Sequence, residues 1–223
     1  MLTGNIVALM YLRLNRQLSA GDYIAWANAE LARGCELPEI AEMASFALER
    51  DPDAREVERY FLQCVQLLGL HMPEDAYQAT RDYWVQTCDR MLDGSLGLDE
   101  GIALLYDIDD DQGYDLMQPW IDLSHHDGAV HWHDKQQQIV ATDIARHGHD
   151  AYTWMLVRQF AALCRLPEAA LPQRFPCVWH CVACGADGGE STDTPQRTAR
   201  CRACGGAGSL KNMRYLDNRQ ALL

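Results

Sequence analysis

The residues best suited to chemistry are cysteines near the end of the chain, which lie in two pairs with the same spacing. Each pair has two residues between its cysteines, and 16 residues separate the pairs. This spacing is typical of a tetrahedral zinc site, because two intervening residues let both sulfurs of a pair reach one ion. Four protein ligands leave no position for water, so such a site is structural. The sequence therefore predicts a structural zinc ion bound by Cys181, Cys184, Cys201 and Cys204.

Two further potential ligands precede the first pair. Cys177 and His180 lie about one turn upstream, so a site that uses either of them in place of Cys181 is one alternative. The other alternative is that both residues lie on a strand and never contact the metal. A redox-active pair of the thioredoxin kind is a rival interpretation, but that motif has a single pair in a strand–helix context.

The composition of the chain changes before these cysteines. From Leu171 onward Cys, Gly, Thr and Arg dominate, and helical periodicity ends. About fifty residues bury little core, so bound metal would supply much of their folding free energy. With the two cysteine pairs and the flanking segments 174–179 and 210–216 as strands, residues 174–217 resemble the zinc-ribbon family. The resemblance implies a small β domain, which we place at 171–223.

The first 170 residues are predicted to form helices joined by short loops. Apolar residues recur at steps of three and four, and Ser19 has the position of an N-cap. The fold class is therefore predicted as mainly α, with an antiparallel helical domain at 1–170, either a bundle or a short solenoid, followed by the small zinc ribbon. The aromatic residues at helical spacing are predicted to lie in the core: Trp26, Tyr60, Tyr77, Trp84 and Trp154.

Charge is distributed unevenly along the chain. The total of −13 disfavours a broad duplex-binding surface, which needs many Lys and Arg side chains. Residues 1–170 hold 12 basic and 28 acidic side chains, a net charge of −16, whereas residues 171–223 hold 7 and 4, a net charge of +3. We therefore expect the helical part to bind a basic protein.

An acidic loop is the predicted contact for this partner, and it contains Asp107, Asp109, Asp110 and Asp111. The loop imitates the start of a calcium-binding EF-hand. That motif requires Gly at the sixth position and Glu at the twelfth, where this chain has Gln112 and Gln118. We therefore interpret the loop as a solvated acidic surface.

Most of the histidines lie between residues 125 and 150, next to several aspartates. Such a group could bind a catalytic metal and activate water, which makes a histidine-dependent metal hydrolase the least favoured alternative. None of them has the His-Glu-x2-His spacing that fixes metal geometry, so we interpret them as loop histidines and predict that the protein is not an enzyme. They are His125, His126, His131, His133, His147 and His149.

The basic residues of the last segment give a second binding alternative. Together with Trp179 and Tyr215 they could form a small nucleic-acid contact, as in a zinc-ribbon regulatory protein associated with nucleic acid. The interpretation that we favour is that these residues either dock against the acidic helical part or are simply solvated. The basic residues are Arg197, Arg200, Arg202, Lys211 and Arg214.

Residues 18–111 resemble small bacterial helical proteins of the toxin-immunity type. The resemblance is carried by the helix starts in 19–27 (SAGDYIAWA) and 92–101 (LDGSLGLDEG). It implies a non-enzymatic bacterial protein, an immunity or adaptor protein, that captures a basic toxin domain. The first residues lack the basic region of a signal peptide, and no stretch reaches the ~18 apolar residues of a membrane span. We therefore expect a cytoplasmic protein that does not bind membranes.

Overall fold

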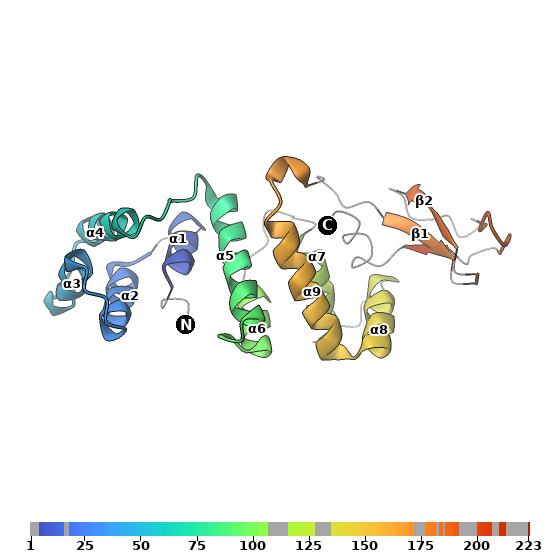
Figure 1. The fold of residues 1–223 in the computed structure, drawn as a ribbon, viewed down its shortest axis with the longest axis horizontal. Coiled ribbons are helices and arrows are strands. Elements are labelled where there is room, and N and C mark those ends of the chain that lie inside the picture. Colours follow the sequence, from blue (N-terminus) through green and yellow to red (C-terminus); the bar gives the residue numbers. More distant parts are fainter. Residues whose placement is uncertain are drawn as a thin grey trace. The chain divides into compact units, whose positions relative to one another are not determined.

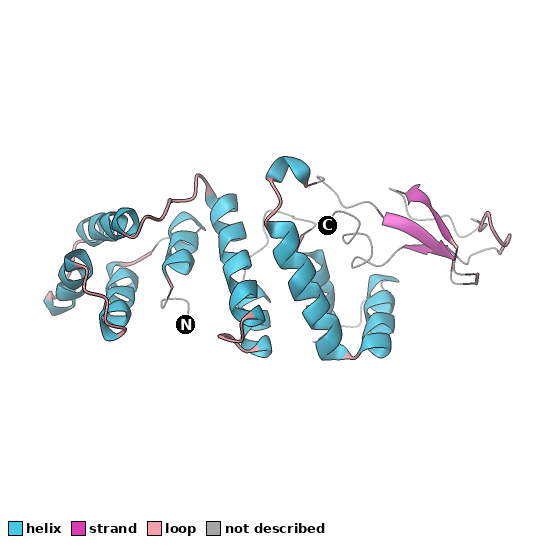
Figure 2. Ribbon diagram, in the orientation of Figure 1, coloured by secondary structure: helices cyan, strands magenta, loops and turns pink. Residues whose placement is uncertain are grey.

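The computed structural model is mainly helical, which confirms the predicted fold class at that level (Figures 1 and 2). It describes residues 5–15, 18–106, 116–127, 135–171, 177–181, 183–184, 186–191, 200–206, 210–212 and 223. The α-helices are α1 (Ile6–Asn15), α2 (Ala20–Ala32), α3 (Pro38–Ser45), α4 (Ala54–Leu67), α5 (Ala76–Leu92), α6 (Leu98–Tyr106), α7 (Gln118–Asp127), α8 (Lys135–His147) and α9 (His149–Cys164). Two short 3-10 helices are η2 (Phe46–Leu48) and η3 (Glu168–Ala170).

The chain divides into two compact units, Met1–Gln86 and Thr87–Leu223. The boundary between them falls inside helix α5. This division differs from the domain boundary predicted between residues 170 and 171. The predicted boundary depends on the change in composition and stays a prediction.

Local capping explains where several helices begin. The Asp22 carboxylate accepts hydrogen bonds from the Ser19 amide at 2.9 Å and from its hydroxyl at 2.6 Å, so Ser19 starts α2 as predicted. Asp53 caps α4 by accepting from the Arg55 amide at 2.9 Å. Helix α7 begins at Gln118, which places Pro119 in its first turn, where proline is tolerated. His125 and His126 consequently lie in this helix, where the sequence interpretation had a loop.

The core of the first unit is built around Phe61 of α4, whose side chain is fully buried. Its ring lies 5.0 Å from that of Tyr23 and 5.6 Å from that of Trp26, both on α2. Aromatic pairs at this separation add to the free energy gained from burial alone. In the same unit the rings of Tyr11 and Tyr83 are stacked at 4.9 Å. Aromatic packing thus joins α2 to α4, and α1 to α5.

Two of the five aromatic residues predicted to lie in the core are fully buried, and Tyr60 packs against the core from its edge. Trp26 and Trp84 are each 1% exposed. Tyr60, Tyr77 and Trp154 are only partly buried. The two tyrosines instead lie beneath guanidinium groups, Arg59 over Tyr60 at 4.9 Å and Arg81 over Tyr77 at 5.5 Å, as suits an amphipathic ring at a core boundary.

The second unit contains a close approach between α6 and the end of α5. Gly101 is buried, and a Cβ atom placed there would lie 2.3 Å from the sulfur of Met91, which is 1% exposed. A methyl group added at position 101 would therefore displace the buried Met91 side chain. Elsewhere in this unit the rings of Trp120 on α7 and Phe160 on α9 pack edge to face at 5.7 Å.

Substitution of Gly101 by alanine is expected to destabilise the second unit by about 1–2 kcal/mol. Overpacking against Met91 costs about 1–3 kcal/mol, and alanine in a helix returns about 0.5–1 kcal/mol. The matched control is Gly21→Ala in α2, where the nearest atom to the new Cβ is the Ser19 hydroxyl at 3.5 Å, so this change should be neutral or stabilising. Urea unfolding followed by circular dichroism measures both, and equal effects would contradict the prediction.

Three short strands follow the helices in the sequence: β1 (Cys177–Cys181), β2 (Asp187–Ser191) and β3 (Leu210–Asn212). They form an antiparallel sheet in the order β2-β1-β3. Cys181, the last residue of β1, is paired with Leu210 of β3, and the register with β2 shifts between Val178 and His180. The central strand therefore leads directly to the first cysteine pair.

Candidate metal centre

The four cysteines predicted to bind zinc lie close together in the structure. The sulfur atoms of Cys181, Cys184, Cys201 and Cys204 all lie within 4.8 Å of one another. None of these four cysteines forms a disulfide bond. Such a group is compatible with a bound metal ion.

Both cysteine pairs are held by the same backbone geometry. The Cys181 amide donates to the Ala186 carbonyl at 2.9 Å, and the Cys201 amide donates to the Gly206 carbonyl at 3.0 Å, five residues ahead in each case. In the second pair the amide of Gly205 also donates back to the Cys201 carbonyl at 2.8 Å. Gly205 has a φ of +70°, which a residue with a side chain adopts only with strain. These turns bring both sulfurs of a pair to the same side of the backbone.

The sulfur separations fit a tetrahedral zinc ion. The sulfur of Cys181 lies 3.7 Å from that of Cys204, and the sulfur of Cys184 lies 3.8 Å from that of Cys201. Four ligands at the usual Zn–S distance of about 2.3 Å are about 3.8 Å apart along the edges of a tetrahedron. The cluster therefore has the dimensions of a four-thiolate site, and this site would leave no open position for a substrate.

The site is buried on one side and exposed on the other. Cys181 and Cys201, the first cysteine of each pair, are 0% and 5% exposed, whereas Cys184 and Cys204 are exposed. Zinc with four thiolates has a net charge of about −2. The exposed guanidinium of Arg200, which donates to the Gly205 carbonyl at 3.3 Å, lies in the same turn and would help to balance this charge if zinc were bound.

The predicted alternative ligands lie outside the part of the chain whose side chains are described. Cys177 and His180 are backbone members of β1, and His180 pairs with Asp187 and Lys211. The structure does not describe their side chains. The assignment of Cys181 as a ligand therefore depends on its place in the four-cysteine cluster. Asp107, Asp109, Asp110 and Asp111, the predicted partner contact, also lie outside the described residues.

Of the six histidines that suggested a catalytic metal, the structure describes the side chains of His147 and His149. His131 and His133 lie outside the described residues, as do the side chains of His125 and His126, and His147 is exposed. Within the described parts of the chain, the four cysteines are the group of three or more potential ligands that meets the geometry of a metal site.

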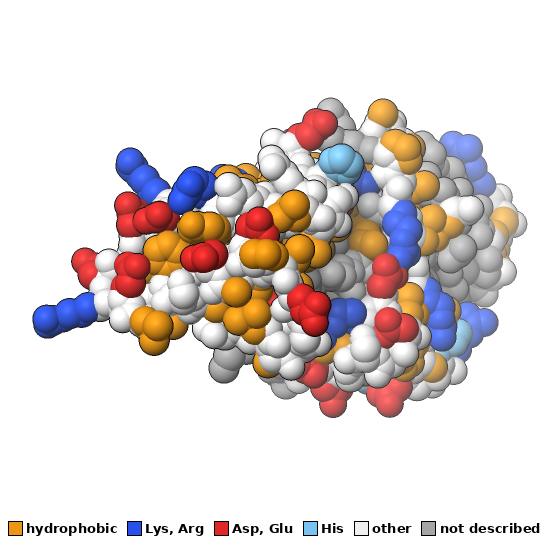
Figure 3. All heavy atoms as spheres, turned by 60° about the vertical axis from the view of Figure 1, so that its left-hand side comes forward, with side chains coloured by type: hydrophobic (Ala, Val, Ile, Leu, Met, Phe, Trp, Pro, Cys, Tyr) orange, Lys and Arg blue, Asp and Glu red, His pale blue; other side chains and the backbone are white. Residues whose placement is uncertain are grey.

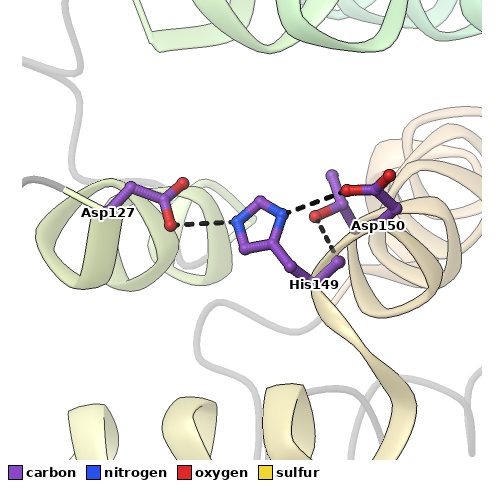
Figure 4. A network of polar contacts seen from close by, with 4 residues as sticks. Asp127, His149 and Asp150 are labelled. Carbon is purple, nitrogen blue, oxygen red and sulfur yellow. Dashed lines mark hydrogen bonds and ion pairs between the residues drawn. The ribbon is translucent and has the colours of Figure 1, made fainter.

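His149 instead connects two helices through hydrogen bonds. Its Nε2 atom lies 3.0 Å from the Asp127 carboxylate at the end of α7, and its Nδ1 atom lies 3.5 Å from Asp150 (Figure 4). The Thr153 hydroxyl also donates to the His149 carbonyl at 2.9 Å. Partial burial lowers the pKa of His149, but the hydrogen bonds and negative charges of Asp127 and Asp150 outweigh this and raise the pKa above 6.5.

This network predicts a pH-dependent contribution to stability. Because the pKa of His149 is raised in the folded state, its contribution is fully present below pH 6.5 and is lost as the pH rises through the higher folded value. The pair is partly exposed, so we expect a contribution of about 0.2–1 kcal/mol. Urea unfolding of His149→Gln at acidic and alkaline pH, repeated in an Asp127→Asn background, measures it. A destabilisation that is the same at both pH values would contradict the prediction.

Cys64 and Cys88, two of the isolated cysteines, have the environment of structural residues. Burial raises the pKa of Cys64 to about 11 and, together with the nearby charge of Asp89, raises the pKa of Cys88 to about 12. Both thiols are 0% exposed. Thiols in this state are poor nucleophiles.

None of the helices in the described parts of the chain combines the length and apolar character needed to cross a membrane. Comparisons with models of protein families, with curated proteins and with solved structures find no match to this chain.

Proposed function

We propose that the protein is a non-enzymatic, cytoplasmic bacterial binding protein that captures a basic protein partner and carries a structural zinc ion in a C-terminal zinc ribbon. The four-cysteine cluster is the observation that carries the proposal. Its sulfur separations of 3.7 and 3.8 Å suit zinc, and four thiolates leave no coordination position for catalysis. A closed metal site supports a role in binding or folding.

The strands around the cluster support the zinc ribbon within this proposal. Cys181 ends the central strand β1, and its partner across the sheet is Leu210 of β3. Zinc would thus tie the end of this strand to the second cysteine pair, 201–204. A segment of this length has little core of its own, so the ion would provide much of its stability.

The surface that we propose for a basic partner lies on α3 and the segment that leads to α4. Residues 36–53 hold six acidic side chains and one basic side chain, Arg50, a net charge of −5. We call this segment the acidic surface. Figure 3 turns forward the side of the molecule that carries α3 and α4, where acidic and hydrophobic side chains lie next to one another. The acidic residues are Glu36, Glu39, Glu42, Glu49, Asp51 and Asp53.

Ion pairing differs between the acidic surface and the acidic residues beside it. Glu30 pairs with Arg33, and Glu56 pairs with Arg59 at 3.3 Å. By contrast, among the described residues the structure has no ion pair to Glu42 or Glu49. Unpaired negative charge attracts a basic protein from a distance and accelerates its association.

An exposed apolar residue lies within this surface. Leu48, in η2, is 91% exposed and directly precedes Glu49. A buried apolar anchor with a charged rim is the usual arrangement of a protein–protein contact. The combination supports capture of a basic protein domain of the kind that toxin-immunity proteins bind.

Affinity capture from a lysate of the source organism tests the proposal. The zinc-loaded protein should retain a basic protein at about 50 mM salt and release it as screening increases. A variant with Glu36→Gln, Glu42→Gln, Glu49→Gln and Asp51→Asn should lose this partner. Retention by that variant, or the absence of a partner at any salt concentration, would contradict the proposed function.

The matched control changes acids that already have partners. Glu30→Gln with Glu56→Gln removes negative charge whose effect is balanced by arginines, and it should leave capture largely intact. Zinc content is measured in every variant, with one ion per chain expected. Retention of an oligonucleotide in place of a protein would support the nucleic-acid alternative.

A further inference from the structure

The four cysteines differ in access to solvent in a regular way. In each pair the first cysteine is buried and the second is exposed. A reagent in solution therefore meets Cys184 and Cys204, while Cys181 and Cys201 lie behind them. Zinc keeps all four sulfurs as thiolates, the nucleophilic form of cysteine.

Two of the close sulfur contacts in the cluster join an exposed cysteine of one pair to the buried cysteine of the other pair. The exposed Cys204 lies 3.7 Å from the buried Cys181, and the exposed Cys184 lies 3.8 Å from the buried Cys201. Each exposed sulfur thus has a buried sulfur of the other pair beside it. This places a second thiolate next to each position that a reagent can reach.

We propose that Cys184 and Cys204 are sites of oxidation by hydroperoxides, and that each then forms a disulfide with the buried cysteine of the other pair, releasing the metal. The inference rests on the proposed zinc site and adds its regulation. Its product is specific: bonds form between Cys204 and Cys181 and between Cys184 and Cys201.

The chemistry balances with hydrogen peroxide as the oxidant. The Cys204 thiolate attacks one peroxide oxygen, the O–O bond breaks, hydroxide leaves, and the sulfur becomes a sulfenic acid. The Cys181 thiolate then attacks the sulfur of Cys204, the S–S bond forms and a second hydroxide leaves. Two electrons pass from two thiolates to one peroxide. Complete oxidation of the site therefore uses two peroxides and releases one zinc ion.

The chain contains its own controls for this reaction. Cys64 and Cys88 are fully buried, and burial raises their pKa values to about 11 and about 12. They are mainly protonated at neutral pH and have no metal to hold them as thiolates. Peroxide at low excess should therefore leave them unmodified.

Trypsin makes the two possible products distinguishable, because Arg202 lies between Cys201 and Cys204. Cleavage after arginine and lysine gives peptides 175–197, 201–202 and 203–211. Bonds across the pairs join 175–197 to 203–211 and to 201–202. Bonds within the pairs join 201–202 to 203–211 and leave 175–197 unattached.

The experiment treats the full-length zinc-loaded protein with hydrogen peroxide and follows released zinc with a chromogenic chelator. Zinc content is measured first. Unreduced tryptic peptides are then analysed by mass spectrometry, with fragmentation to locate the bonded cysteine in 175–197. We expect cross-pair bonds, one zinc released for two peroxides, and dimedone labelling of Cys184 and Cys204 at early times.

The outcomes separate the two proposals. A protein that binds no zinc contradicts the proposed function. A protein that binds zinc but retains it in peroxide, or that forms bonds within each pair, contradicts the present inference alone. Early dimedone labelling of Cys181 or Cys201 would also contradict it.

Discussion

Replacement of Cys201 by serine is expected to abolish stoichiometric zinc binding. A serine hydroxyl is a poor zinc ligand, and Cys201 is one of only two sulfurs that lie on the buried side of the cluster. Loss of an outer-shell partner of a metal site costs about 10–100-fold in affinity, and loss of a ligand should exceed this. Elemental analysis of the purified protein and competition with a chelator measure the effect.

Ala203→Ser is the matched control for this change. Ala203 lies in the same turn, two residues from Cys201, and its side chain is exposed. Zinc content should remain at one ion per chain in this variant. If Cys201→Ser also retains one zinc ion with unchanged affinity, the assignment of the four ligands is wrong.

Replacement of Phe61 by alanine is expected to destabilise the first unit by about 3–5 kcal/mol, the usual effect of removing a buried aromatic ring. The Phe61 ring contacts Tyr23 and Trp26 at centroid distances of 5.0 and 5.6 Å, so its loss leaves a cavity between α2 and α4. A loss of this size is a large fraction of the stability of a typical domain. Urea or thermal unfolding followed by tryptophan fluorescence measures it.

Leu48→Ala is the control for apolar truncation in the same unit. Leu48 is 91% exposed, so its removal should change the free energy of unfolding by less than about 0.5 kcal/mol. A small effect at Phe61, comparable to that at Leu48, would show that α4 is not packed as described.

The parts of the molecule that could be predicted from sequence are those governed by short-range geometry. A Cys-x2-Cys pair forms a turn within a few residues of the chain. Here the turns contain the backbone hydrogen bonds from Cys181 to Ala186 and from Cys201 to Gly206. The start of α2 is likewise local, because Ser19 and Asp22 are three residues apart. Apolar periodicity within single helices was sufficient for the mainly helical fold class.

Other features depend on packing between distant residues and could not be predicted. Asp127 and His149 are 22 residues apart, and their hydrogen bond exists only because the end of α7 lies beside the start of α9. The difference in exposure between Cys181 and Cys184 is equally non-local, since it depends on what covers each sulfur. Helical spacing also does not distinguish a fully buried aromatic residue from one at the edge of the core, such as Tyr60.

Helix α5 (Ala76–Leu92) has a practical consequence for dissection of the protein. The boundary between the two units follows Gln86, so a cut at that point would divide a continuous helix. The new ends would expose the last four carbonyls of one fragment and the first four amides of the other. A truncated protein that retains either unit therefore needs the whole of α5, and fragments designed around each unit should overlap in sequence.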